Sequence, residues 1–254
     1  MFETLEVNAD GPVGQLWLNR PDRLNALSTR VLQELAGAAR WFDEQPGVRV
    51  VIVGGRGRAF SAGADLDGFP GIDDTGLRAA ADAGRIMADA IEAMRVPTVA
   101  RIQGWCVGGG LVLAAACDLR VAAASARFSI PEIDLGIPLA WGGIPRLVRE
   151  IGPALTKELV ITCREFGPDE ARAAGVLNRV VPGAELDAAA RDLAAQVAAR
   201  PPGPVAATKR HTNAVTSQML GTARAWSDAD SLIASLIDPE CAQARENYFK
   251  ARGH

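Results

Sequence analysis

Apolar and polar positions repeat with two different periods along the chain. A period of two predicts a strand at Val13–Leu18, and apolar residues three and four apart predict an amphipathic helix over residues 28–45, capped by Ser28. Residues 48–53 form a short run of mostly apolar, β-branched residues, which is typical of a buried strand. The same patterns predict helices over residues 77–94 and 109–117, and extended segments over residues 97–102, 119–122 and 127–130.

Strand, glycine-rich turn and helix recur in this order, which favours an α/β fold with buried sheets. From about residue 184 the pattern is almost entirely helical, with one interruption at Pro201-Pro202-Gly203-Pro204. We therefore divide the chain into a core at residues 1–200 and a helical region at residues 201–254. The helical region is too short to hold a core of its own comfortably, so we expect it to dock on other structure.

Composition narrows the function. Of the 254 residues, 48% are hydrophobic and 22% are charged, as in ordinary globular proteins, and the net charge is -3. The basic residues form no stripe, which argues against a nucleic-acid partner. No apolar run reaches the roughly 20 residues of a membrane span, and residues 1–6 do not resemble a signal peptide. The four cysteines lie far apart, so we expect reduced thiols in a cytoplasmic protein. With only two histidines, a metal site is improbable.

Three short segments carry candidate chemistry. Residues 59–66 and 103–110 are rich in glycine and other small residues, each directly after a predicted strand, so their backbone N–H groups can approach a ligand. A helix that begins near Gly109 directs free N–H groups outward, which suits a developing oxyanion. Glu132 lies between apolar residues after Pro131, and burial there raises a carboxyl pKa toward that of a general base. Ordinary turns and a surface glutamate are the plainer interpretations.

These segments occur in a familiar order. Asn19-Arg20-Pro21, Asn25-Ala26-Leu27, residues 59–66, residues 104–110 running into Cys117-Asp118, Pro131-Glu132 and Gly142-Gly143 resemble the crotonase (enoyl-CoA hydratase/isomerase) family over residues 13–250. The resemblance implies a crotonase-like spiral of ββα turns and a C-terminal helical region that mediates trimers or dimers of trimers. It also implies an acyl-CoA substrate and no separate cofactor, since coenzyme A is part of the substrate.

The resemblance assigns roles to particular residues. The oxyanion amides fall on Ala64 and Gly109, and the catalytic acid falls on Glu132. The remaining positions fall into two groups, a CoA-binding group and an acyl-pocket group. The CoA-binding group is Arg23, Leu24, Ala62, Asp65 and Leu66, with Phe249 and Lys250 reaching an adjacent subunit. The acyl-pocket group is Trp105, Val112, Ala140 and Trp141, in which the two tryptophans either narrow the pocket or serve as core aromatics.

One position departs from the family pattern. Hydratases of the family use two glutamates, and the first of them falls on Val112, which cannot move a proton. A single carboxylate suffices to shift a double bond, so the sequence favours isomerisation over efficient hydration. A substitute acid among Asp67, Asp73, Asp74 and Asp134 remains open, and residues 67–75 form a variable loop beside the pocket.

Two other functions remain open. A family member without its first glutamate could bind acyl-CoA and turn nothing over. Separately, Gly104-Trp105-Cys106-Val107-Gly108 matches the G-x-C-x-G elbow of hydrolases, with His211 available as a base.

Overall fold

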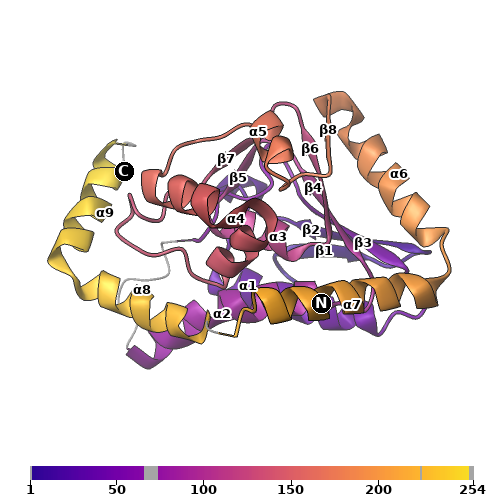
Figure 1. Ribbon diagram of the computed structural model, residues 1–254, viewed down its shortest axis with the longest axis horizontal. Coiled ribbons are helices and arrows are strands. Elements are labelled where there is room, and N and C mark those ends of the chain that lie inside the picture. The colour runs from indigo at the N-terminus through magenta and orange to yellow at the C-terminus, as the bar shows by residue number, and fades with distance from the viewer. Residues whose placement is uncertain (1, 66–73, 224, 252–254) are drawn as a thin grey trace.

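The computed structural model describes residues 2–65, 74–223 and 225–251 (Figure 1). Its main sheet has the strand order β1-β2-β3-β4-β6-β8, in which β1 and β2 are antiparallel and all later neighbours are parallel. The strands are β1 (Leu5–Asn8), β2 (Val13–Leu18), β3 (Val50–Gly55), β4 (Thr98–Ile102), β6 (Leu119–Ala123) and β8 (Arg179–Val181). The α/β class predicted from the sequence is confirmed.

The central strand β3 is apolar because it is buried on both faces. All six of its residues are buried, and alternate side chains enter different clusters. Val51 and Val53 face the larger hydrophobic cluster, whereas Val50 and Ile52 face a second cluster on the other side of the sheet. An unbroken apolar run is therefore the pattern that two covered faces require.

Helices cover both faces of the main sheet. On the larger cluster pack α1 (Thr29–Asp43), α2 (Asp74–Ala93) and α3 (Gly109–Ala116), and on the smaller one packs α6 (Leu186–Ala198). The Ser28 side chain accepts the N–H of Val31 at 3.4 Å and caps α1, as the sequence predicts.

A second, small sheet corrects one prediction. The segment 104–110, predicted as a turn, contains the strand β5 (Trp105–Val107), which pairs in parallel with β7 (Arg127–Ser129). Single bridges join Ser61 to Cys106 and Leu27 to Ala64. These bridges hold the glycine-rich segment around residues 61–64 beside the start of α3.

The rest of the chain is mostly helical. It comprises η1 (Pro21–Arg23), α4 (Gly143–Thr162, broken at Gly152), α5 (Pro168–Ala173), η3 (Gly183–Glu185), α7 (Pro202–Met219), η4 (Ala225–Ser227), α8 (Asp228–Ile237) and α9 (Pro239–Ala251). Pro202 begins α7, where the missing N–H of proline costs no hydrogen bond because the first helical N–H groups have no partner inside the helix. The proline run that interrupts the helical pattern therefore also starts the next helix.

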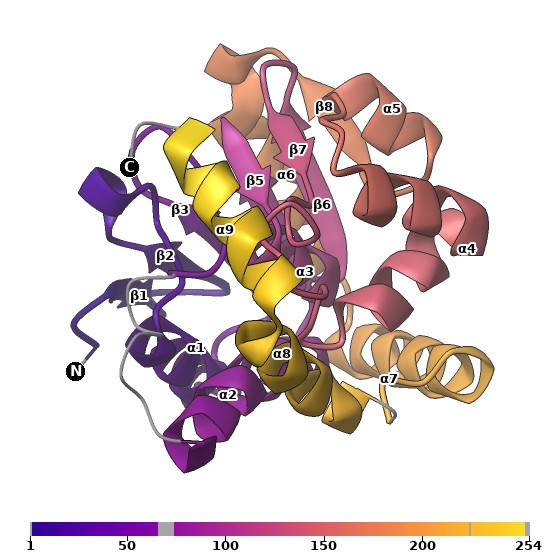
Figure 2. The same cartoon turned by 90° about the vertical axis from the view of Figure 1, so that its left-hand side faces the viewer.

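The C-terminal helices lie against the same chain. Lys209 of α7 is buried and donates to Asp118 at 2.8 Å and to the Val96 carbonyl at 3.1 Å. Figure 2 shows α8 beside α2, and α9 crossing in front of β5 and α3. No helix within the described ranges is long and apolar enough to cross a bilayer.

Candidate functional site

Glu132 lies in the tight turn that follows β7. Its carbonyl accepts the N–H groups of Leu135 and Ile137 at 3.1 and 2.9 Å, which fixes the turn. The side chain is 8% exposed, and its Oε2 atom is buried with no hydrogen-bond partner in the described structure. Burial raises the pKa of this carboxyl from 4.5 to about 7, the largest cause being the loss of hydration of the charged form. A carboxyl with this pKa can both take and return a proton near neutrality.

Gly108 makes room for this carboxyl. Its φ of 46° lies in the left-handed region, and a Cβ at this position would overlap Glu132 Oε1. The Gly108 N–H donates to the Ser129 carbonyl at 3.0 Å, which ties the turn before α3 to the end of β7. Only glycine combines this backbone conformation with so close a contact to Glu132.

The amides of Ala64 and Gly109 are available to a ligand. Leu27 pairs with the residues on either side of Ala64, donating to Gly63 O at 2.8 Å and accepting from Asp65 N at 3.1 Å. Neighbouring N–H groups of an extended segment alternate in direction, so the Ala64 N–H points away from Leu27. Gly109 opens α3, where an N–H has no partner inside the helix. Neither N–H donates a hydrogen bond to any described residue.

The two amide segments also lie close together. A Cβ placed on Gly63 would come within 2.8 Å of Val107 O and 3.6 Å of Gly109 N. This close approach of backbone to backbone explains why small residues fill positions 62–64. Two free N–H donors on adjoining segments can polarise one carbonyl oxygen.

Both amides and Glu132 line one small cavity of about 30 Å³, which we call the Glu132 cavity. Its lining residues are Ala64, Gly109, Val112, Glu132, Ile137, Pro138, Leu139, Ala140, Trp141 and Leu232. Glu132 is the single titratable residue of this lining in the described part of the chain. Val112, on the facing helix α3, is 1% exposed and apolar. One carboxyl, two free amides and apolar walls are thus brought together.

Four of the predicted CoA-binding residues share one surface beside Ala64. The Asp65 carboxylate accepts from Arg20 at 2.8 Å and lies 3.7 Å from Arg23. The Ala62 N–H donates to the Leu24 carbonyl at 2.9 Å, which joins η1 to the glycine-rich segment. Asp65 therefore helps to place Arg23. Leu66, the fifth, lies outside the described residues.

Phe249 and Lys250 lie on α9. The Lys250 ammonium is exposed and 3.4 Å from Glu246, and the Phe249 ring packs edge-on against Tyr248 with 5.9 Å between centroids. A Cβ on Gly136 would overlap the backbone of Cys241, so the start of α9 rests on the turn that follows Glu132. The helix that carries both residues is therefore placed by the loop of the candidate site.

Other residues that the sequence indicated for the site do not line the cavity. Trp105, expected in the acyl pocket, is 37% exposed on β5 and is not among the residues that line the cavity, because its strand turns its side chain outward. Asp134 is exposed and also lies outside the lining. Asp67 and Asp73, like the side chain of Asp74, lie outside the described structure.

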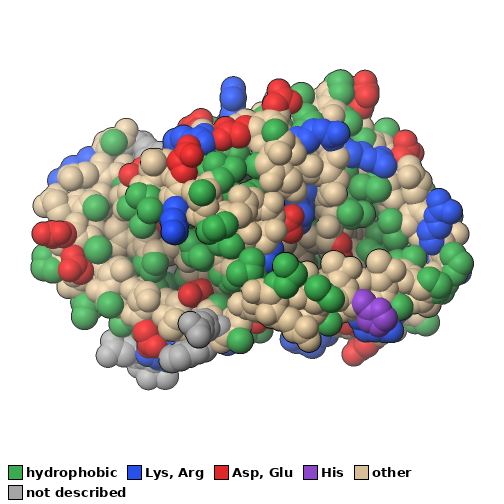
Figure 3. All heavy atoms as spheres, viewed as in Figure 1, with side chains coloured by type: hydrophobic (Ala, Val, Ile, Leu, Met, Phe, Trp, Pro, Cys, Tyr) green, Lys and Arg blue, Asp and Glu red, His purple; other side chains and the backbone are tan. Residues whose placement is uncertain are grey.

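The geometry does not support the cysteine hydrolase. Cys106 is fully buried, and burial raises the pKa of its thiol far above the usual value, so little thiolate forms. His211 is exposed on α7, in a polar stretch at the surface (Figure 3). The Gly-x-Cys-x-Gly match reflects the glycines that β5 and α3 require.

The cavity also contains residues that the sequence did not single out. Ile137, Pro138 and Leu139 follow Glu132, and Leu232 comes from α8 in the C-terminal region. Proximity to Glu132 was an available signal for the first three. Leu232 is an apolar position of an amphipathic helix, and nothing in its local pattern distinguishes it from a core residue.

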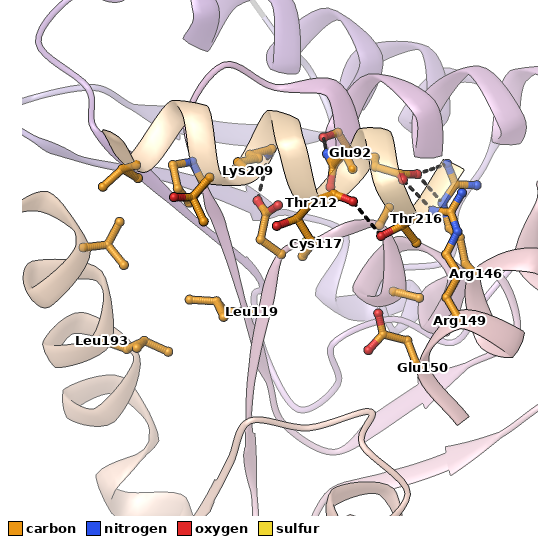
Figure 4. A pocket seen from close by; sticks show the side chains of 18 of the residues that line it. Glu92, Cys117, Leu119, Arg146, Arg149, Glu150, Leu193, Lys209, Thr212 and Thr216 are labelled. Atoms are coloured by element: carbon orange, nitrogen blue, oxygen red, sulfur yellow. Dashed lines mark hydrogen bonds and ion pairs between the residues drawn. The ribbon is translucent and has the colours of Figure 1, made fainter. Parts of the chain in front are cut away.

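A second and larger hollow of about 630 Å³ lies under α7, and we call it the α7 hollow. Figure 4 shows Leu193 of α6 on one side of it and Arg149 of α4 on the other, with Lys209 of α7 above. Lys209 is paired with Asp118, and Arg149 is paired with Glu92 at 2.6 Å.

Comparison with solved structures defines the class of fold. The chain superimposes on an enoyl-CoA hydratase/isomerase from Xanthobacter autotrophicus Py2 with a TM-score of 0.88 and 29% identity, covering 98% of this chain and 93% of the other. An enoyl-CoA hydratase from Mycobacterium avium subsp. paratuberculosis K-10 superimposes with a TM-score of 0.87 at 27% identity, and the match covers 96% of this chain and 98% of the other. The fold is the crotonase fold.

Sequence comparison gives the family. A family model described as enoyl-CoA hydratase/isomerase matches residues 8–239. A probable enoyl-CoA hydratase of Mycobacterium tuberculosis is 38% identical over 199 residues, 77% of this chain and 76% of the relative. The peroxisomal Delta(3,5)-Delta(2,4)-dienoyl-CoA isomerase of Arabidopsis thaliana is 34% identical over an alignment of 262 positions, which covers 95% of this chain and 94% of the relative. The chain belongs to the enoyl-CoA hydratase/isomerase family, whose enzymes are lyases or isomerases.

Proposed function

We propose that this protein shifts the double bond of an enoyl-CoA thioester, with Glu132 as the acid–base group and the Ala64 and Gly109 amides as oxyanion donors. The observation that carries the proposal is the buried, unpartnered Oε2 of Glu132, in a cavity whose facing helix presents Val112. A carboxyl kept free of protein partners is available to a substrate. The pKa of about 7 suits a group that must first accept and then donate.

The reaction needs only these groups. The Glu132 carboxylate takes a proton from the α-carbon of a 3-enoyl thioester, and the electron pair moves onto the thioester oxygen. The N–H groups of Ala64 and Gly109 stabilise this enolate oxygen, each donor being worth about 2.7–4 kcal/mol. When the enolate collapses, the γ-carbon takes the proton back from Glu132. The product is the conjugated 2-enoyl thioester, and no atom is gained or lost.

Hydration asks for more than this site offers. A water must be held, deprotonated and added while the α-carbon is protonated, and family hydratases divide this work between two glutamates. One positioned acid–base group contributes roughly 10²- to 10⁴-fold. With valine at position 112, we expect hydration to be slower by about this factor than it would be with a second glutamate there. The relatives include both hydratases and an isomerase, so the choice rests on Val112 and not on the comparisons.

Coenzyme A enters the proposal as part of the substrate. Arg23, Leu24, Ala62 and Asp65 form the surface beside Ala64 on which we place it, together with Leu66. Phe249 and Lys250 would contact the CoA of a neighbouring subunit in a homotrimer or dimer of trimers, an assembly that light scattering would test.

Mass spectrometry of reaction products tests the proposal. Wild type should convert 3-enoyl-CoA to its 2-enoyl isomer faster than it adds water to 2-enoyl-CoA. Glu132→Gln should slow the shift by about 10²- to 10⁴-fold, whereas Asp134→Asn, which removes an exposed carboxylate from the same turn, should leave it unchanged. Equal turnover by wild type and Glu132→Gln would refute the role of Glu132.

A binding protein without turnover is the second candidate, and the apolar Val112 is the observation that favours it. It predicts acyl-CoA binding in calorimetry with no product from either class of substrate. Any product that depends on Glu132 would exclude it.

A further inference from the structure

We propose that Trp141 and Leu232 form walls of the Glu132 cavity that restrict the substrate to a short acyl chain. The inference rests on the proposed acyl-CoA function and specifies its substrate class. Neither wall takes part in the proton transfer. Each comes from a different part of the chain, Trp141 from the turn before α4 and Leu232 from α8.

Trp141 is seated on two glycines. Its side chain is 8% exposed, and a Cβ at either Gly84 of α2 or Gly109 of α3 would overlap the indole ring. The ring therefore lies against both helices, directly beside one of the oxyanion amides. A larger residue at position 84 would occupy the space of the indole, so Gly84 is needed for the ring to lie where it does.

The turn that carries the indole is held from both sides. Trp141 has a φ of 62°, an uncommon conformation for a bulky residue that surrounding contacts must hold. Arg146, 1% exposed, donates to the Trp141 carbonyl at 3.2 Å and the Gly142 carbonyl at 3.3 Å, and Asp228 accepts the Gly142 N–H at 2.8 Å. Arg146 also pairs with Glu92 of α2 at 2.6 Å. These contacts oppose an outward swing of the ring.

Leu232 completes the apolar surface. It is 4% exposed and packs with Ile137 of the turn after Glu132. Its helix α8 is held to α2 by the Arg78–Asp230 ion pair at 2.5 Å and to the Trp141 turn through Asp228. The C-terminal region thus closes the catalytic cavity of its own chain.

The resulting space is small. A site needs roughly 10–15 Å³ of this kind of volume to hold one water molecule. The Glu132 cavity, at about 30 Å³, has a volume of little more than two water molecules on this measure. So limited a space favours an acyl group of a few carbon atoms over a long aliphatic tail.

Binding of saturated acyl-CoA esters tests the inference without relying on turnover. Calorimetry would compare butyryl-, hexanoyl-, octanoyl- and decanoyl-CoA with wild type, Trp141→Ala, Leu232→Ala and the control Trp17→Ala. Trp17 is a matched control, because its ring also lies against a glycine, Gly54, but is packed beside Arg56 and does not line the cavity. Each methylene that gains a buried site should tighten binding about fourfold.

We expect wild type and Trp17→Ala to bind butyryl-CoA at least tenfold more tightly than decanoyl-CoA. Trp141→Ala should gain at least tenfold for decanoyl-CoA, and Leu232→Ala should show a smaller gain in the same direction. Wild-type binding of decanoyl-CoA as tight as that of butyryl-CoA would overturn the inference and leave the proposed function standing. Failure of wild type to bind any of the four esters would overturn both. Should Trp141→Ala not fold, the wild-type series and Leu232→Ala decide the question.

Discussion

The Glu132 cavity and the α7 hollow differ in size by about twentyfold, at about 30 and 630 Å³, yet it is the smaller one for which we propose the chemistry. In the α7 hollow, Lys209, Arg146 and Glu150 each lie in an ion pair, with Asp118, Glu92 and Arg120 respectively. Arg149 of the same hollow is paired with Glu92 through one guanidinium nitrogen, although its Nη2 atom is buried without a hydrogen-bond partner. In the Glu132 cavity one carboxyl oxygen is buried without any partner. A charge that is already paired stabilises the fold, whereas an unpaired buried group is available to a substrate. The pairing of the charges, more than the volume, is the reason we assign the reaction to the Glu132 cavity.

Replacing the unpaired group should have the largest effect. Glu132→Gln keeps the shape of the side chain but removes its proton transfer, so kcat should fall by about 10²- to 10⁴-fold. Steady-state kinetics on 3-enoyl-CoA would measure it, with Asp134→Asn as the control. A loss confined to KM would contradict the acid–base role.

Breaking a paired group should act on stability instead. Lys209→Met leaves Asp118 part-buried without its cation, and removal of one partner of a buried pair typically costs about 3–5 kcal/mol. Part of this cost is relieved because Asp118 keeps its contacts with Thr98 and is 21% exposed. Urea unfolding should show the loss, while kcat of the folded variant stays at the wild-type value. A selective loss of kcat would place the α7 hollow in the reaction.

Stability should also depend on pH through Glu132. Its folded pKa lies above its unfolded value, so the protonated form is favoured by folding and stability falls as pH rises from about 4.5 through about 7. The difference between these values corresponds to about 3 kcal/mol. Glu132→Gln has no such proton, so its stability relative to wild type should increase by up to about this amount between about pH 4 and pH 8. A constant difference across this range would show that Glu132 keeps an ordinary pKa.

The smallest effect is expected at the buried thiols. Burial raises the pKa of Cys117 to about 12, and that of Cys106 still further, so alkylation near neutral pH should leave activity unchanged. Rapid inactivation together with modification of Cys106, located by peptide mass spectrometry, would revive the hydrolase.

The sequence predicted the parts that depend on local pattern. The Ser28 cap, the buried strand β3 and the burial of Glu132 each follow from a few neighbouring residues, and the structure confirms all three. The strand β5 was missed because three residues between glycines give no periodicity, and its pairing with β7 is a long-range property.

The walls of the cavity were harder to predict. The sequence indicated Trp141, but its position against Gly84 and Gly109 depends on contacts between three separate elements. Leu232 was missed because its place in the cavity depends on how α8 docks, which no local pattern encodes. The roles assigned to the site residues remain predictions.

Exchange of the α-proton in deuterium oxide tests the proton transfer most directly. Incubation of a 3-enoyl-CoA thioester with enzyme, followed by mass spectrometry, measures deuterium entering at the α- or γ-carbon at each pH. Wild-type exchange should rise with pH and level off above about pH 7, where Glu132 is ionised, and Glu132→Gln should be slower by at least about a hundredfold. Exchange by Glu132→Gln at the wild-type rate, or a wild-type rate indifferent to pH, would contradict the account.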